Sequence, residues 1–416
     1  MDLYDRTINE RSISKLIRRH DVDEDEHLLD STYRAKIISE TIAKAKTGFS
    51  RLDFVVSNLN GKFLYQCRHW SDELLFRKLT RNLRQKTGVY QSDRFDIVRA
   101  ITNFCEEGLP YRIYKADIKN FYETIDVDFL LTNLKVDFDT SPTTYKLFDT
   151  LFQCLKHQKI AGLPRGLALS ASLSEYSLKE FDRQIPLFPD VFYYARYVDD
   201  MIVITNGKED QNAFLSNIEA LLPVGLKFNK RKTGAKSFLG SFVKKKQDKF
   251  VDSFRFLGFE FRVNEISGES NRRLRKVVVD ISPTKINKAK TKLIIAARSF
   301  LSDKNFNLFE RRLKLITANY TFYDRSRSAF RKAGFYYSYG LIDADISTSL
   351  KDIDVFLRRM LLSRSGKLYS VLSVALTPAQ RKTLLKYSFR KNFIEKRHYS
   401  YSSSKLNEAL ECWKYV

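Results

Sequence analysis

Two adjacent carboxylates, Asp199 and Asp200, stand between two runs of strand-forming residues. An aromatic-rich run over 191–197 precedes them and an apolar, β-branched run over 201–205 follows, which is the pattern of a strand, a tight turn and a returning strand. Two like charges at the tip of an apolar hairpin repel each other and resist desolvation, so a divalent cation would stabilise them. Asp-Asp is also common in ordinary turns, because Asp hydrogen-bonds to its own backbone. The pair therefore needs a further carboxylate to indicate a metal site.

Asp117 offers that carboxylate, near the end of a short alternating strand and before a helix-like stretch. Three carboxylates that converge on two Mg²⁺ ions, with Mn²⁺ as the alternative, could activate a 3′-hydroxyl and neutralise a leaving pyrophosphate. We therefore predict a two-metal site made by Asp117, Asp199 and Asp200.

Three segments resemble, in order and spacing, the palm motifs of reverse transcriptases, in particular the bacterial retron and defence-associated enzymes. They are Asp117 with Phe121-Tyr122, the stretch 162–175 that begins Gly-Leu-Pro-Arg-Gly, and Tyr197-Val-Asp-Asp200. Each motif alone is weakly specific, whereas the three in this order are not. The resemblance covers about 88–261 and implies an α+β right-hand polymerase. Such a fold has fingers and a palm with an antiparallel sheet, followed by an α-helical thumb and, here, a C-terminal helical extension.

The resemblance implies a role for each acidic residue. Asp117 and Asp199 would be the main metal ligands, the carbonyl of Ile118 would join them, and Asp200 would support the second carboxylate or the primer end. The stretch 225–233 resembles the next palm motif, in which a lysine lies near the departing pyrophosphate. Lys232 is our candidate for the general acid that assists this departure.

A nucleotide pocket is also implied. Tyr122, with Phe121 beside it, stands where the family excludes a ribose 2′-hydroxyl by bulk, although an aromatic residue at this spacing is also an ordinary core residue. Arg165 and Gly166 belong to a loop that supports the template base and the incoming nucleotide, and Ser170 starts the helix that follows. Many relatives have Gln in place of Arg165 and Ser-Pro in place of Ser170-Ala171. These two departures leave fidelity and primer type open.

The fingers of the resembling family cover the triphosphate with a hairpin followed by basic helices. Here a hairpin is predicted over 49–67 around Asn60-Gly61, and a basic helical stretch follows it. We predict that Arg68, Arg77 and Arg94 contact phosphate or template, and a solvated helix face is the equal alternative for each. An acidic cluster over 21–30 interrupts the basic trend and is predicted to be a solvated loop.

Two features further along the chain predict contact with a primer–template duplex. Leu257-Gly258 resembles the turn that grips the primer strand, and the glycine allows backbone to approach backbone. Between residues 225 and 298 there are twenty Lys or Arg against six Asp or Glu. This excess is suited to tracking phosphates along a duplex. Its peaks are Lys244, Lys245, Lys246, Arg272 and Arg273.

The 416 residues suffice for two or three subdomains. We expect N-terminal helices and fingers over 1–110, the palm over 111–265, and a mostly helical thumb with its extension over 266–416. A net charge of +24 predicts a polyanionic partner. The sequence has no long apolar run, no signal-peptide core and no paired-cysteine motif, so we expect a cytoplasmic protein without a membrane span or a zinc site.

These features predict an RNA-directed DNA polymerase that adds dNTPs to a 3′ end and leaves a DNA product on an RNA template. No RNase H, protease or endonuclease segment is recognisable, which favours anti-phage defence with a dedicated non-coding RNA over a retron or mobile-element role. An RNA-binding scaffold without synthesis, an RNA-dependent RNA polymerase and an untemplated nucleotidyltransferase stay open as alternatives. The sequence does not specify the priming group, or whether a companion protein or a second copy takes part.

Overall fold

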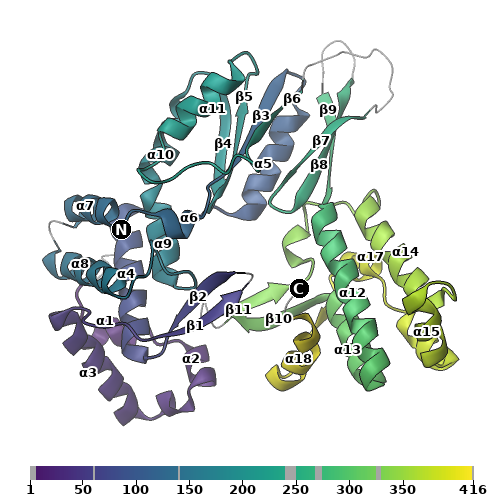
Figure 1. The fold of residues 1–416 in the computed structure, drawn as a ribbon, viewed down its shortest axis with the longest axis horizontal. Helices are drawn as coiled ribbons and strands as arrows, with labels where there is room; N and C mark the ends of the chain where they lie inside the picture. The colour runs from purple at the N-terminus through teal and green to yellow at the C-terminus, as the bar shows by residue number, and fades with distance from the viewer. Residues whose placement is uncertain are drawn as a thin grey trace. The chain divides into compact units, whose positions relative to one another are not determined.

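The computed structural model describes residues 6–59, 61–138, 141–238, 250–267, 274–324 and 329–414 (Figure 1). The chain divides into two compact units. The first comprises Met1–Ser92, Tyr111–Ser237 and Asp324–Ala329, and the second comprises Asp93–Pro110, Phe238–Tyr323 and Phe330–Val416. Helices and antiparallel sheets occur in both units, so the predicted α+β class is confirmed. The predicted division into fingers, palm and thumb stays a prediction.

A four-stranded sheet forms the centre of the first unit, in the order β4-β5-β3-β6. Strand β5 is antiparallel to both of its neighbours. Its apolar run is almost fully buried, with Met201 and Ile202 at 0% exposure, as a central strand covered on both faces requires. The bounds are β3 Tyr111–Asp117, β4 Val191–Tyr197, β5 Asp200–Thr205 and β6 Gly234–Phe238.

The first unit also contains a set of helices and one hairpin, and α10 and α11 lie beside the sheet (Figure 1). The hairpin, β1 Phe54–Leu59 with β2 Lys62–Cys67, confirms the prediction, while Asn60 lies outside the described residues. A continuous apolar core joins α3, α4, α8 and α9 to the sheet. The helices are α1 Glu10–Ser14, α2 Arg19–Glu24, α3 Ser31–Thr47, α4 Trp70–Thr87, α6 Phe121–Thr124, α7 Val127–Asp137, α8 Pro142–His157, α9 Ala168–Ser177, α10 Lys179–Gln184 and α11 Gln211–Ala220, with short 3-10 turns η1 Glu26–Leu29 and η2 Ile185–Leu187.

The second unit combines a three-stranded antiparallel sheet with a group of helices (Figure 1). The sheet consists of β7 Phe250–Phe256, β8 Phe259–Ser267 and β9 Leu274–Ile281, and α5 Arg94–Glu106 packs against β9. The other elements are α12 Pro283–Asp303, α13 Phe306–Thr317, α14 Thr348–Leu362, α15 Lys367–Ala375, α16 Pro378–Leu384, α17 Phe389–Ile394, α18 Ser403–Leu410, 3-10 turns η4 Tyr336–Ser338 and η5 Glu411–Trp413, and a small sheet of β10 Asn319–Asp324, β11 Ala329–Ala333 and β12 His398–Tyr399.

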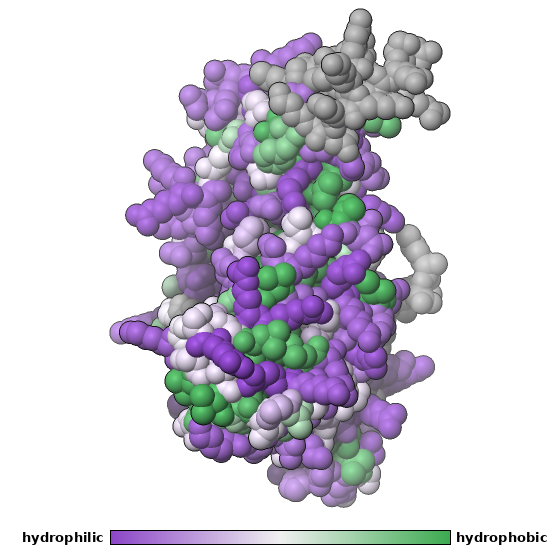
Figure 2. Space-filling view, turned by 90° about the vertical axis from the view of Figure 1, so that its right-hand side faces the viewer, coloured by the Kyte–Doolittle hydropathy of each residue, from purple (hydrophilic) through white to green (hydrophobic). Residues whose placement is uncertain are grey.

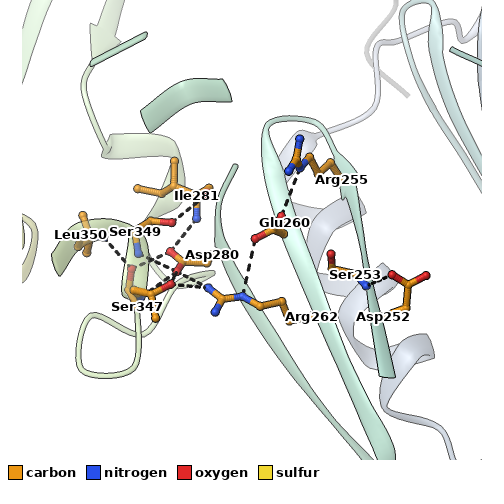
Figure 3. Close-up of polar contacts among 11 residues, drawn as sticks. Asp252, Ser253, Arg255, Glu260, Arg262, Asp280, Ile281, Ser347, Ser349 and Leu350 are labelled. Carbon is orange, nitrogen blue, oxygen red and sulfur yellow. Dashed lines mark hydrogen bonds and ion pairs between the residues drawn. The ribbon is translucent and has the colours of Figure 1, made fainter. Parts of the chain in front are cut away.

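A buried carboxylate, Asp280, joins β9 to the start of α14 in this unit (Figure 3). It accepts hydrogen bonds from the Ser347 hydroxyl at 2.7 Å and from the backbone N–H groups of Thr348 and Ser349, each at 3.0 Å. Arg262 on β8 donates a further bond at 2.7 Å. Because the first N–H groups of a helix have no partner inside the helix, this one side chain satisfies several of them at once.

Among the described residues, no helix combines the length and the apolarity that a membrane crossing would require. The face drawn in Figure 2 is mostly hydrophilic, with apolar residues in small separate patches.

Candidate active site

The hairpin of β4 and β5 carries the acidic pair at its tip. Tyr197 and Asp200 are register partners, so Val198 and Asp199 form the turn between them. Val198 has φ +61°, in the left-handed region that β-branched residues rarely adopt. A residue held there costs on the order of 1–3 kcal/mol, and such strain persists only where surrounding contacts impose it.

Arg196 supplies a contact that holds this turn. Its guanidinium is buried and donates to the Val198 carbonyl at 2.8 Å. It also donates to Asp182 at 2.8 and 2.5 Å and forms an ion pair of 2.7 Å with Glu175. Burial raises the pKa of Glu175 despite this arginine. The strained turn is therefore anchored to α9 through Glu175 and, through Asp182, to α10.

Register brings the third acid to the pair. Asp117, at the end of β3, is the register partner of Asp200 at the start of β5. The next residue, Ile118, donates its backbone N–H to the carbonyl of Asp199 at 3.2 Å. The antiparallel sheet thus gathers at one edge the three carboxylate-bearing residues and the Ile118 backbone that the sequence singled out.

The electrostatics of this edge are unbalanced. Burial, with the negative charge of Asp117 as a further contribution, raises the pKa of Asp199. Asp117 is 5% exposed and accepts from Lys232 Nζ at 2.8 Å and from Asn229 Nδ2 at 3.1 Å. The hydrogen bond to Asp117 raises the pKa of Lys232, so its ammonium stays protonated at neutral pH. Lys232 therefore places a protonated donor and a counter-ion beside Asp117.

The donor chemistry of this edge fits a hard divalent cation, since the carboxylates and the Ile118 carbonyl are all oxygen donors. Within the part of the chain that the structure describes, however, no three His, Cys, Asp or Glu side chains are arranged as a ready metal cage. The ammonium of Lys232 occupies one oxygen of Asp117. A metal ion bound at that oxygen would share it with Lys232 or displace the ammonium.

A glycine-bearing loop packs against the residues that follow Asp117. Gly162 has φ +60°, and a Cβ there would lie 2.1 Å from the carbonyl oxygen of Tyr122, so a side chain is excluded. Gly166 has φ +102°, and a Cβ there would lie 2.7 Å from the carbonyl oxygen of Tyr65 on β2. The loop is therefore fixed between α6 and the hairpin.

Arg165, between these glycines, forms a bidentate ion pair with Glu123, with N···O distances of 2.5 and 2.8 Å. Its guanidinium also lies 4.7 Å from the centre of the Tyr122 ring. Burial raises the pKa of Tyr122. The structure therefore brings together three predicted nucleotide-binding residues, Tyr122, Arg165 and Gly166. It adds Glu123, which no sequence pattern singled out.

The other predicted residues of the first unit differ in exposure. Phe121 and Ser170 are 1% and 2% exposed and belong to the packed interior. Arg77 is also buried and donates to Asp21 at 2.6 and 3.0 Å. The predicted contact of Arg77 with phosphate is therefore not supported. We expected Asp21 to lie in a solvated loop, whereas it is buried and pairs with Arg77. Arg68 is exposed, pairs with Asp53 at 3.1 Å, and borders a cavity of about 420 Å³.

The remaining predicted residues belong to the second unit or lie outside the described residues. Arg94 begins α5. Leu257 and Gly258, with φ +47° and +78°, form the two-residue turn between β7 and β8. The basic residues outside the described part of the chain are Lys244, Lys245, Lys246, Arg272 and Arg273.

Residues 73–261 match the family model described as Reverse transcriptase (RNA-dependent DNA polymerase). No curated protein matches the chain significantly. Among solved structures, the chain is similar to apo telomerase from Candida tropicalis truncated from its C-terminal domain, with 14% identity and a TM-score of 0.34. That match covers 55% of this chain and 58% of the telomerase chain, so the chain spans little more than half of that relative's length. All the palm motifs singled out in the sequence lie within the range of the family match.

Proposed function

Since residues 73–261 form a reverse transcriptase domain, we propose that the protein is an RNA-directed DNA polymerase that adds deoxynucleotides to a 3′ end. The observation that carries this proposal is the register of the central sheet. Asp117 lies opposite Asp200, and the Ile118 N–H donates to the Asp199 carbonyl. These pairings bring Asp117 to the adjacent pair Asp199-Asp200, which is distant from it in the sequence.

In this proposal Asp117, Asp199 and the Ile118 carbonyl would hold two divalent cations, Mg²⁺ with Mn²⁺ as the alternative. Bound there, the cations would neutralise phosphate charge and activate the 3′-hydroxyl. Asp200 supports the second carboxylate or the primer end. Lys232 donates its proton from Nζ to the departing pyrophosphate, and its raised pKa keeps that proton in place until phosphate charge arrives.

Tyr122 selects the sugar in the same proposal. Its ring is half-buried and lies against Arg165, whose guanidinium is held in turn by Glu123. These contacts stop the ring from swinging aside, so a 2′-hydroxyl in the sugar position would meet it sterically. Deoxynucleotides would therefore be preferred to ribonucleotides.

Labelled dNTP or rNTP incorporation by the full chain, purified with its bound RNA and supplied with Mg²⁺ or Mn²⁺, tests the proposal. We expect DNA synthesis that disappears in Asp199→Asn and survives in Asp149→Asn, which removes a carboxylate on α8 whose contact is with Gln153. Sequencing of the product and of the retained RNA then identifies the template. Synthesis that persists in Asp199→Asn would remove Asp199 from the catalytic set.

One observation favours the second candidate, an RNA-binding scaffold without synthesis. Lys232 pairs with Asp117 at 2.8 Å, so part of the negative charge of this edge is balanced by a side chain of the protein itself. A scaffold would retain RNA and yield no product with either metal ion or either class of nucleotide. The incorporation assay therefore separates the two candidates.

The finer biological role rests on the sequence resemblance alone. It comprises anti-phage defence, a dedicated non-coding RNA template, and a companion protein or second copy. Phage plating efficiency in cells with wild-type protein or Asp199→Asn tests the defence role. Equal plating in the two strains, with DNA synthesis intact in wild type, would favour a retron or mobile-element role instead.

A further inference from the structure

A basic cavity of about 340 Å³ lies in the first unit, between the end of α1, the middle of α4 and the start of α9. Among its described lining residues there is no carboxylate. The cavity beside Arg68 differs, because Glu24, Asp25 and Glu73 contribute to its wall. The cationic residues that line the basic cavity are Lys15, Arg18, Arg77, Arg81 and Arg84. The charge of Arg77 is balanced by Asp21 and Glu73, so Arg77 contributes to the wall and not to the positive charge of the cavity.

Two of these arginines build the walls. Arg77 donates to the Leu16 carbonyl at 3.0 Å as well as to Asp21, which ties the segment after α1 to α4. Arg84 donates from Nε to the Ser172 hydroxyl at 2.9 Å, which ties α4 to α9. Contacts within the protein therefore hold the walls of the cavity together.

The other cationic residues, Lys15, Arg18 and Arg81, are exposed at the cavity. Removing charge at Lys15 or Arg81 thus leaves the ties made by Arg77 and Arg84 in place.

The arrangement suits a chain of phosphates better than a single one. Lys15 and Arg18 come from the segment after α1, whereas Arg81 and Arg84 come from α4, so positive charge lines the cavity from two elements. Tyr90 also lines the cavity, is 61% exposed, and has its ring 5.9 Å from the Arg84 guanidinium. An exposed aromatic ring beside a row of cations is suited to a base stacked next to a phosphate backbone.

We propose that this basic cavity binds a single-stranded segment of nucleic acid, with phosphates on Lys15, Arg18, Arg81 and Arg84 and a base on Tyr90. None of its lining residues belongs to the acidic edge of Asp117, Asp199 and Asp200. The identity of the strand rests on the proposed function, since RNA is what a reverse transcriptase carries. Binding itself requires no synthesis.

The test is equilibrium binding of a fluorescent single-stranded RNA to the full chain, freed of bound nucleic acid, over a KCl series without nucleotides. In Lys15→Gln/Arg81→Gln, we expect weaker binding and a salt slope smaller by about 1.4, since each lost phosphate contact on a single strand removes about 0.7. Lys36→Gln/Lys46→Gln, which removes two exposed charges from α3, should leave affinity and slope unchanged. Lys15→Arg/Arg81→Lys keeps both charges and should retain the wild-type slope.

Equal slopes in the two Gln double variants, with melting temperatures unchanged, would overturn the proposal. Tripolyphosphate, used as a competitor, tests whether the ligand is a free polyphosphate. The proposal would also be overturned by two results together: tripolyphosphate displaces RNA from wild type at concentrations that leave the Lys15→Gln/Arg81→Gln complex intact, and Tyr90→Ala has no effect on RNA binding. We expect Tyr90→Ala to weaken RNA binding severalfold at an unchanged salt slope. Because binding is measured without dNTPs and repeated in Asp199→Asn, a protein that binds RNA here but synthesises nothing would contradict the polymerase proposal alone.

Discussion

Two buried acidic sites in this molecule are built in opposite ways. Asp280, fully buried in the second unit, accepts from two hydroxyls, three backbone N–H groups and one guanidinium (Figure 3). At the edge of the central sheet, Asp117 and Asp199 lie close to each other, and burial with like charge raises the pKa of Asp199. A saturated carboxylate serves structure, whereas an acid left with excess charge is a candidate for function.

The backbone also differs between the two sites, because it is regular at Asp280 and strained next to Asp199. Asp280 lies in a regular strand and faces the start of a helix, where negative charge is favourable. Asp199 follows Val198, whose positive φ is held by Arg196. Asp199 lies beside a strained turn, whereas Asp280 accepts hydrogen bonds from several donors. We therefore expect substitution of Asp199 to change activity and substitution of Asp280 to change stability.

The largest expected effect is on activity. Asp199→Asn should reduce dNTP incorporation to background, while the free energy of unfolding without metal stays equal or rises. The raised pKa of Asp199 means that its charged form is disfavoured in the fold. Stability from this group is therefore fully present below the unfolded pKa and is lost as pH rises through the folded pKa.

Denaturant unfolding of wild type and Asp199→Asn from acid to neutral pH measures this difference. The variant should gain relative to wild type as pH increases. A variant that loses stability and activity together would break the comparison, since Asp199 would then be a structural residue like Asp280.

Asp280→Ala should have the largest effect on stability. It leaves Arg262 and the first N–H groups of α14 without their acceptor, and breaking a buried, hydrogen-bonded ion pair costs about 3–5 kcal/mol. Thermal unfolding checks this, with Asp352→Ala on the exposed face of α14 as the matched control. A loss below about 1 kcal/mol would show that water replaces the contacts of Asp280 readily.

The acidic edge was predictable because its evidence is local. The alternation before Asp117 and the two runs that flank Asp199-Asp200 define strands, and antiparallel pairing of those strands brings their ends together.

The partners of these residues were not predictable, because each contact joins elements through tertiary packing. Arg196 with Glu175 and Asp182, and Asn229 on Asp117, have no spacing that would signal them. For Arg77, the sequence suggested a contact that the tertiary structure does not support. Its basic helix suggested a phosphate contact, and only the fold reveals that Asp21 is buried beside it.

Arg196→Lys keeps the positive charge and removes the planar guanidinium, whose three nitrogens all donate. The variant therefore tests whether these hydrogen bonds, and not the charge alone, hold the turn. A lysine cannot donate to Val198 and to both carboxylates at once. We expect kcat for dNTP incorporation to fall about 10–100-fold, equivalent to about 1.4–2.7 kcal/mol, with a smaller change in KM. Arg183→Lys, at the exposed pair with Glu180, is the matched control and should retain wild-type kcat. Equal kcat in both variants would mean that the turn keeps its geometry without Arg196.

The smallest expected effect concerns selectivity at the edge of the acidic site. Tyr122→Val should raise ribonucleotide incorporation relative to deoxynucleotide incorporation about tenfold, because the ring that would meet a 2′-hydroxyl is removed. Tyr122→Phe keeps the ring and should keep the preference. Thr348→Val, which removes one hydroxyl bond to Asp280, should shift the melting temperature and leave the preference unchanged. Competition between labelled dNTP and rNTP measures the ratio. If Tyr122→Val changes only the melting temperature, Tyr122 is a packing residue. The functional residues of this site would then be limited to Asp117, Asp199, Asp200 and Lys232.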